Sequence, residues 1–255
     1  MIQKLADQLS TLLVVTLVIL FCASGMTSCY HKKQPTSEPA ASTEPTVPPT
    51  QTIPATEAPT RLVWPAEAPE GYFDDALFIG DSRTVGLQEY GNIPGASFYA
   101  TSGMSVYSIF SEEVGKRTLQ DLMETEKFGK VYLMLGINEL GYDFNKTVAK
   151  YVDLVRWIQL YQPDAVVYVQ ANLHVSAKRS KSDKVYNNRN LDTFNAEIAK
   201  IADGEKVFYL DVNPLFDDGA GNLADTYTVD DSHVLGKYYL TWAQWLAKNA
   251  AVASA

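Results

Sequence analysis

The pattern of apolar and polar positions divides the chain into three parts. A nearly unbroken apolar run occupies residues 12–23, and residues 34–60 are rich in Pro and Thr with almost no large apolar side chain. Alternating apolar segments begin at residue 76. The middle stretch cannot bury enough surface to offset its ordering entropy, so we expect an extended, disordered tether there. The last part has the periodic patterns of a packed domain.

Five short apolar runs in the last part predict buried strands. The runs are nearly continuous, which is typical of strands that are covered on both faces in a parallel sheet. The predicted strands are residues 77–79, 97–100, 131–135, 165–169 and 207–210.

Helical periodicity fills the intervals between these strands. Apolar residues recur at helical spacing from Val148 to Ile158, and Gln162-Pro163-Asp164 ends that pattern. A second pattern extends from Leu191 to Ile201, and a third occupies residues 236–248. Repeated strand–helix alternation predicts a three-layer α/β/α domain with a five-stranded parallel sheet and right-handed crossovers.

Parallel sheets of this kind place their sites beyond the carboxyl ends of the strands. The residues that directly follow the predicted strands are therefore the first candidates for chemistry. These segments are residues 80–82, 101–103, 136–139, 171–172 and 211–213.

Charge excludes one broad class of function. The 255 residues contain 21 basic and 30 acidic side chains, a net charge of -9. The first 61 residues are neutral overall, so the later part carries all of the negative charge. A general nucleic-acid binder needs a basic surface to neutralise phosphates. We therefore expect no nucleic-acid partner.

The N-terminal segment has the properties of an export signal. Its apolar run of 12 residues is short for a membrane span, which needs about 20. The run ends in Met26-Thr27-Ser28-Cys29, which resembles the lipobox of bacterial lipoproteins, with Met26 in place of the usual Leu. The resemblance implies a signal peptide at residues 1–28, lipidation of Cys29 and anchoring at the extracellular face of the bacterial membrane. An uncleaved N-terminal membrane anchor and a plain secreted protein remain alternatives.

This division predicts a tether at residues 29–69 and a domain at residues 70–255. Cys22 and Cys29 are the only cysteines, so the domain contains none. Catalysis by cysteine and zinc bound by cysteine are thereby excluded for the domain. The sequence contains no phosphate-binding loop or dinucleotide fingerprint, and we expect neither a cofactor nor a metal.

A serine, a histidine and an aspartate form the strongest candidate constellation. Ser82 directly follows the first predicted strand, and His233 follows Asp230 by three residues, close enough to meet in one turn. A nucleophilic serine needs a base of near-neutral pKa, and that base needs an acid that orients it. Asp231 is an alternative partner for the histidine, although spacing favours Asp230.

The order of four short motifs resembles the SGNH (GDSL-type) hydrolase superfamily over roughly residues 71–248. The motifs are Gly80-Asp81-Ser82, Gly103, Gly136-Ile137-Asn138-Glu139 and Asp230-Asp231-Ser232-His233. The resemblance implies that Ser82 is the nucleophile, His233 the general base and Asp230 its orienting acid. It also implies an oxyanion hole made by the backbone N–H groups of Ser82 and Gly103 and the side-chain amide of Asn138.

Several residues near these motifs leave questions open. Glu139 stands where the family usually has Asp, which puts the local packing in question. Arg83 is either a clamp for a substrate anion or a structural ion-pair partner, and His174 is a candidate at the substrate rim or a structural residue. The loop at residues 178–184 concentrates four basic side chains and is either a solvated surface or a lid for an anionic polymer.

These observations together predict a surface-anchored serine esterase. We expect it to remove small acyl groups, above all acetyl, from a cell-wall or extracellular carbohydrate through an acyl-enzyme intermediate. A non-catalytic glycan-binding or scaffolding lipoprotein on a hydrolase fold is one alternative. A lipase or thioesterase for longer acyl chains is another, and it would need an apolar groove.

Overall fold

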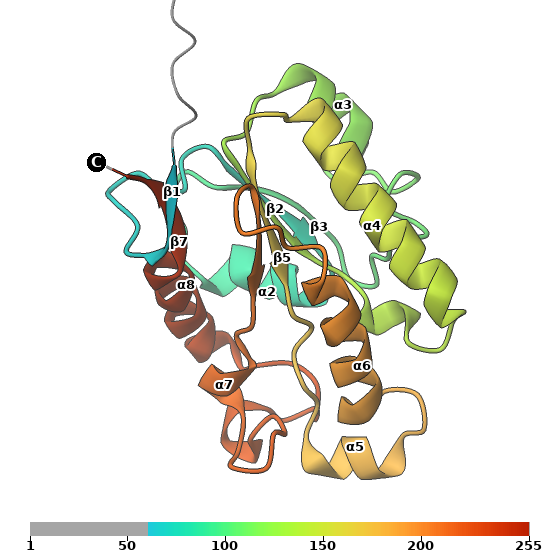
Figure 1. Ribbon diagram of the computed structural model, residues 1–255. Coiled ribbons are helices and arrows are strands. Elements are labelled where there is room, and N and C mark those ends of the chain that lie inside the picture. The colour runs from blue at the N-terminus through green and yellow to red at the C-terminus, as the bar shows by residue number, and fades with distance from the viewer. Residues whose placement is uncertain (1–60, 255) are drawn as a thin grey trace, which may run out of the picture. The chain divides into compact units, whose positions relative to one another are not determined.

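The computed structural model describes residues 61–254 (Figure 1). The predicted signal peptide, the lipidation of Cys29 and most of the predicted tether fall outside these described residues. No helix within residues 61–254 combines the length and apolar character that a membrane span requires.

A five-stranded parallel sheet forms the centre of the domain, as predicted. Its strands are β2 (Ala76–Gly80), β3 (Ser97–Ala100), β4 (Lys130–Met134), β5 (Val166–Gln170) and β6 (Val207–Leu210). They lie in the order β3-β2-β4-β5-β6, and each neighbouring pair is parallel. The order reverses beside β2, so the loops that follow β2 and β4 diverge there and leave a crevice for a site.

Helices cover both faces of this sheet. One face holds α3 (Leu119–Thr125), α4 (Phe144–Tyr161) and α6 (Asn188–Ala199), and the other holds α2 (Ser82–Tyr90) and α8 (Tyr239–Lys248) (Figure 1). The three-layer α/β/α prediction is therefore confirmed, and α4, α6 and α8 coincide with the predicted helices.

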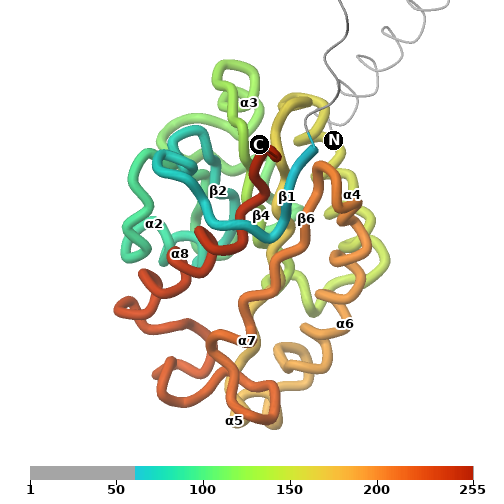
Figure 2. The backbone as a smooth tube through the Cα atoms, turned by 60° about the vertical axis from the view of Figure 1, so that its left-hand side comes forward, coloured from blue at the N-terminus to red at the C-terminus, as the bar shows by residue number. Residues whose placement is uncertain are grey.

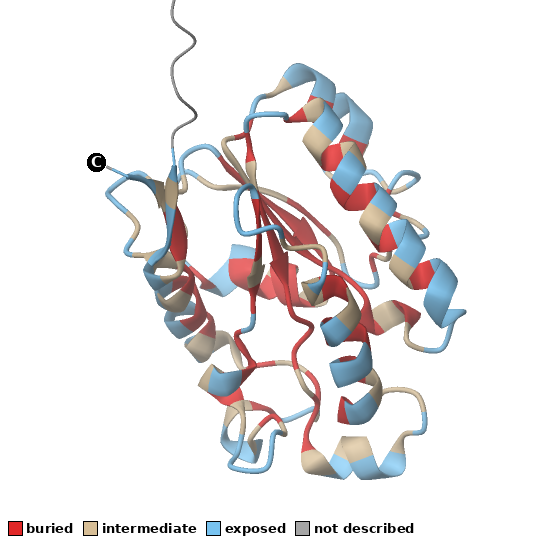
Figure 3. Ribbon diagram, viewed as in Figure 1, coloured by how far each residue is buried: buried red, intermediate tan, exposed pale blue. Residues whose placement is uncertain are grey.

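Alternation along each strand sends successive side chains into the two layers of core. Leu77 and Ile79 pack toward α4 and α6, whereas Phe78 stacks on Tyr132 of the next strand beneath α8. The strands are accordingly buried on both faces, while each helix buries one side only (Figure 3). This explains why the strands appear in the sequence as continuous apolar runs.

Short helical segments occupy the connections at the carboxyl ends of the strands. These are η1 (Ile137–Glu139), α5 (Ala177–Ser182), α7 (Asn213–Phe216), η2 (Asp225–Tyr227) and η3 (Gly236–Tyr238). In Figure 1, both α5 and α7 are in the lower part of the domain.

A second, two-stranded sheet corrects the predicted boundary of the domain. Leu62–Ala66 form β1, which pairs antiparallel with β7 (Ala250–Ala253). Figure 2 shows β1 beside the C-terminal end of the chain. Residues 62–66 therefore belong to the folded domain, whereas the sequence pattern placed them in the tether. Trp64 adds a ring contact with Phe208 of β6, with centroids 5.2 Å apart, which holds β1 against the central sheet.

Candidate active site

Ser82 lies at the first position of α2, directly after β2. Asp81 caps this helix, and its Oδ1 accepts a hydrogen bond from the backbone N–H of Arg83 at 2.9 Å. The helix start exposes free N–H groups and partial positive charge, which favour a developing negative charge nearby. The strand-to-helix turn thus presents the Ser82 hydroxyl where an anionic intermediate is stabilised.

The structure brings Ser82, His233 and Asp230 into one hydrogen-bonded chain. Ser82 Oγ lies 2.8 Å from His233 Nε2, across 151 residues of sequence. His233 Nδ1 lies 2.7 Å from Asp230 Oδ2. A proton on Nδ1 is thereby directed to the carboxylate, and Nε2 is left to accept the serine proton. This is the geometry that activates a serine nucleophile.

Asp230 is held in its ionised form by several donors. Its Oδ1 accepts hydrogen bonds from the backbone N–H groups of Ser232 at 2.9 Å and His233 at 2.8 Å. Partial burial would raise the pKa of Asp230, but these bonds and the imidazole outweigh it and hold the pKa below its ordinary value. A permanent carboxylate can orient the imidazole and stabilise the imidazolium that forms during catalysis.

The neighbouring Asp231 has a different task, which resolves the alternative that the sequence left open. Its backbone adopts the left-handed conformation with φ 67°. The Asp231 carboxylate instead accepts from Ser176 Oγ and from Lys178 Nζ, each at 2.8 Å. Asp231 therefore ties the loop of His233 to α5.

A tight turn after β3 presents the backbone of Gly103. Met104 N–H donates to Thr101 carbonyl oxygen at 3.2 Å and closes the turn, in which Gly103 has φ +82°. A positive φ at the third residue is the mark of a type II turn and favours Gly there. The hydrogen bond that closes the turn uses the N–H of Met104 and not that of Gly103.

Asn138 lies in η1, after β4. Its side-chain amide donates one hydrogen bond to the Met104 carbonyl oxygen at 3.0 Å, which leaves its second N–H for another acceptor. The contact also joins η1 to the turn that contains Gly103. All three groups of the predicted oxyanion hole thus belong to segments at the same end of the sheet.

A buried asparagine pair, which the sequence analysis did not single out, fixes the backbone of this site. Asn172 follows β5, accepts from Ile137 N–H at 3.0 Å and donates to the Leu135 carbonyl oxygen at 3.0 Å. Asn195 of α6 in turn accepts from Asn172 N–H at 2.8 Å. The sequence offers one sign of this role, since Asn172 lies just after a strand, where site residues of parallel sheets are found.

Glu139 is buried, with 2% of its surface exposed. Its Oε1 accepts from Val106 N–H at 2.6 Å, so Glu139 and Asn138 together join η1 to the segment after β3. Burial raises the pKa of Glu139 to about 7, against the opposing effect of the Val106 hydrogen bond. The Glu139 side chain, which replaces the usual Asp, is therefore accommodated inside the domain.

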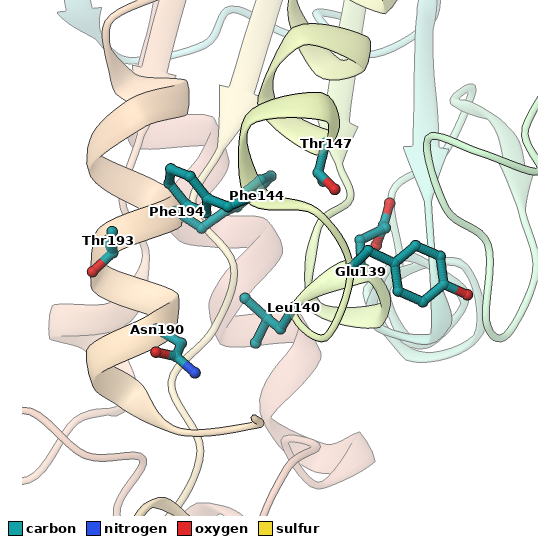
Figure 4. A pocket seen from close by; sticks show the side chains of 8 residues that line it. Glu139, Leu140, Phe144, Thr147, Asn190, Thr193 and Phe194 are labelled. Carbon is teal, nitrogen blue, oxygen red and sulfur yellow. The ribbon is translucent and has the colours of Figure 1, made fainter. Parts of the chain in front are cut away.

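Glu139 also borders a small cavity of about 190 Å³ between α4 and α6. Figure 4 shows Glu139 and Leu140 on one side of it and Asn190 and Thr193 of α6 on the other. Neither Ser82 nor the histidine and aspartate chain lines this cavity, so it is separate from the candidate catalytic group.

The structure supports the ion-pair alternative for Arg83. Only 2% of its side chain is exposed. Its guanidinium lies 3.9 Å from the buried Asp81 carboxylate and donates to the Ser232 carbonyl oxygen at 3.1 Å. Arg83 therefore connects the start of α2 to the loop of His233, and a contact with a substrate anion stays a prediction.

The predicted role of His174 in substrate binding is not supported by its position. Both ring nitrogens are occupied, because Nδ1 lies 2.8 Å from Asp217 and Nε2 lies 2.8 Å from Asp192. Partial burial lowers the pKa of His174, but the two carboxylates outweigh this effect and raise it. The contacts are those of a structural residue that joins α6 to the segment after β6.

The candidate catalytic group opens on a cleft of about 430 Å³ that is lined mainly by polar and charged residues. Arg179 and Tyr186 also line it, although nothing in the sequence distinguishes Arg179 from the other basic residues of its loop. The complete lining is Ser82, Arg83, Ile137, Asn138, Arg179, Tyr186, Asp230, Ser232 and His233. Within residues 61–254, no three His, Cys, Asp or Glu side chains gather as a metal site.

Comparisons with known proteins agree with the fold of the domain. The model of the GDSL-like lipase/acylhydrolase family matches residues 78–239. A GDSL-like lipase from Bacteroides thetaiotaomicron is similar in structure, with a TM-score of 0.54 and 16% identity over 70% of this chain and 88% of that one. An acetyl xylan esterase, AlAXEase, has a TM-score of 0.51 and 18% identity over 68% and 98% of the two chains. No curated protein matches the sequence.

Proposed function

The chain belongs to the GDSL-like lipase/acylhydrolase family and is a serine ester hydrolase, and from this premise we propose that it removes acetyl groups from an acylated carbohydrate at the bacterial cell surface. The observation that carries the proposal is the Ser82–His233–Asp230 chain opening on a cleft lined mainly by polar and charged residues. Its reaction would follow the two-step acyl-enzyme route.

In the first step, Ser82 Oγ attacks the ester carbonyl carbon while His233 Nε2 takes the hydroxyl proton. The carbonyl oxygen becomes an oxyanion, which the N–H groups of Ser82, Gly103 and Asn138 stabilise. The intermediate collapses with cleavage of the bond to the sugar oxygen. His233 returns its proton to that oxygen, so the sugar leaves as an alcohol and the acetyl group remains on Ser82.

In the second step, a water molecule replaces the sugar. His233 takes a proton from the water as its oxygen attacks the acetyl carbonyl carbon, and the same donors stabilise the second oxyanion. Cleavage of the Ser82 ester releases acetic acid, which ionises to acetate, and His233 returns its proton to Oγ. Asp230 orients the imidazole in both steps and stabilises its protonated form.

The composition of the cleft favours a short acyl group and a polar substrate. Ile137 is the single aliphatic side chain in the lining given above. A longer acyl chain needs an apolar groove, because leaving it in water forfeits about 0.8 kcal/mol per CH₂. The similarity in fold to an acetyl xylan esterase is consistent with a carbohydrate ester.

The surface location rests on the sequence of residues 1–60. The lipobox-like Met26-Thr27-Ser28-Cys29 supports a lipid on Cys29, and the Pro-rich tether would let the domain reach into a surrounding wall. Metabolic labelling with an alkyne fatty acid should mark the wild-type protein but not Cys29→Ser. An unlabelled wild-type protein that stays in the membrane would favour the uncleaved anchor.

Hydrolysis of 4-nitrophenyl acetate tests the catalytic assignment. The wild-type protein should hydrolyse it, and Ser82→Ala should reduce the rate to that of buffer. Ser111→Ala is the matched control, because this exposed serine lies outside the cleft and should leave the rate unchanged. Acetate release from isolated wall polysaccharide then tests the carbohydrate substrate, and no release beyond the Ser82→Ala background would count against it.

A further inference from the structure

Arg179 differs from the other basic side chains of its segment. Lys178, Arg179 and Lys181 all belong to the short helix α5, but only Arg179 lines the cleft together with Ser82 and His233. Lys178 is engaged with Asp231 at 2.8 Å. Lys181 is exposed and lies outside the cleft lining. Among the basic side chains of α5, Arg179 is thus the one that borders the candidate catalytic group.

The guanidinium of Arg179 is positioned by an aromatic ring and has hydrogen-bond donors to spare. It lies over the ring of Tyr186, 5.4 Å from the centroid, and both residues line the cleft. Its nearest carboxylate, Asp183, is 3.6 Å away and lies beyond good hydrogen-bond distance. Arg179 Nε is buried and has no acceptor among the described residues.

Asp183 pairs with Arg179 only through Oδ2, at 3.6 Å, which is too long for a good hydrogen bond. Its Oδ1 already accepts from the backbone N–H groups of Val185 and Tyr186, both at 2.9 Å, and these bonds lower the pKa of Asp183. The Asp183 carboxylate therefore stabilises the backbone turn that leads to Tyr186. The planar guanidinium of Arg179 therefore still has N–H donors in a forked arrangement. This arrangement matches the carboxylate of a bound molecule in addition to that of Asp183.

The segment that holds Arg179 is fixed to the catalytic loop. Ser176 caps α5 by accepting from Arg179 N–H at 3.2 Å. Asp231, next to Asp230, binds both Ser176 and Lys178. The position of Arg179 relative to Asp230 and His233 is therefore set by direct contacts, as a specificity site requires.

We propose that Arg179, stacked on Tyr186, is a subsite that binds a carboxylate of the substrate beside the scissile ester. One guanidinium matches one negative charge, and the acidic residues Asp183 and Asp230 nearby disfavour a doubly charged phosphate. The preferred substrate is then an acetylated acidic sugar of the uronic-acid type. This inference rests on the proposed esterase function and names its substrate class.

Two substrates that differ in one group test the subsite. These are mono-O-acetylated methyl glucuronoside and methyl glucoside, which carry a carboxylate or a hydroxymethyl group at the same carbon. Acetate release by the detergent-solubilised full chain gives kcat/KM for each. The wild-type protein should prefer the glucuronoside at least 10-fold, and Arg179→Gln should lower that value about 10- to 100-fold. The glucoside should change less than twofold.

Two further variants complete the experiment. Lys181→Gln removes the same charge from the same helix outside the cleft, and it should leave both substrates within twofold. Arg179→Lys keeps the charge but loses the fork, so it should retain an intermediate preference. The unchanged glucoside value reports that Arg179→Gln is folded.

Three results would overturn the subsite. They are a wild-type protein without preference for the glucuronoside, an equal loss of both activities in Arg179→Gln, and an equal loss of preference in Lys181→Gln. In each case hydrolysis of 4-nitrophenyl acetate would leave the esterase function standing. If the wild-type protein were as inert as Ser82→Ala toward that ester, the proposed function itself would fail, and the subsite with it.

Discussion

Glu139 gives the domain a specific pH dependence, which Glu139→Gln should remove. The carboxyl is buried beside Asn138, with one oxygen accepting from Val106 N–H and the other without a partner in the described part of the chain. Burial raises its pKa from the ordinary 4.5 to about 7. Gln has the same shape and can still accept from Val106, but it cannot ionise.

The sign of the effect follows from the proton bound in each state. The unfolded chain loses the Glu139 proton near pH 4.5, whereas the folded chain keeps it until about pH 7. The stability gained from the neutral buried form is present below pH 4.5 and is lost as the pH rises through 7. The shift corresponds to about 3 kcal/mol at full ionisation, and about 2.5 kcal/mol of this change falls between pH 5 and pH 8.

Urea unfolding followed by tryptophan fluorescence measures this difference. The stability of Glu139→Gln relative to the wild-type protein should increase by about 2–3 kcal/mol from pH 5 to pH 8. Glu70→Gln is the matched control, because Glu70 is exposed and its replacement should leave the wild-type pH dependence intact. If Glu139→Gln followed the wild-type curve at both pH values, the buried carboxyl would not be ionising as described.

Four further substitutions test the catalytic assignments and the packing of the domain. Asn138→Ala should lower kcat for an acetyl ester about 100- to 1000-fold with little change in KM, and a change confined to KM would refute its place in the oxyanion hole. Asp230→Asn should lower kcat by about 10⁴-fold, whereas Asp231→Asn should retain most activity, and equal losses would contradict the assignment of the two aspartates. Gly136→Ala should destabilise the domain by about 2–4 kcal/mol in urea unfolding, since a Cβ there would lie 2.2 Å from the Phe194 ring at a φ of +129°, and wild-type stability would refute this packing.

The central sheet and the main helices could be predicted because their signals are local. Residues 131–135 form a continuous apolar run, and the apolar residues of α4 recur every three or four positions, as burial on two faces or on one face demands. The strand β1 has no comparable signal, since its sequence LVWPA contains Pro65 and its partner β7 is mostly alanine. The pairing of β1 with β7 joins the two ends of the domain. Local periodicity in the sequence cannot predict a contact between segments so far apart.

The part of the candidate site that could be predicted from the sequence is the part whose residues have a recognisable place relative to a strand or to each other. Ser82 follows a strand, and His233 is three residues from Asp230, so their meeting could be expected from the order of motifs. Arg83 and Arg179 could not be separated in this way. Arg83 contacts Ser232, which is remote in sequence. Arg179 lies over the ring of Tyr186, and this tertiary contact has no signal in the local sequence.

Covalent labelling with a fluorophosphonate tests most directly whether Ser82 is an activated nucleophile. Intact-protein mass spectrometry should show one adduct on the wild-type chain, and peptide mapping should locate it on Ser82. Ser82→Ala should remain unlabelled, and His233→Ala should be labelled far more slowly because Oγ loses its base. An unlabelled wild-type protein, or an adduct that persists in Ser82→Ala, would contradict the account.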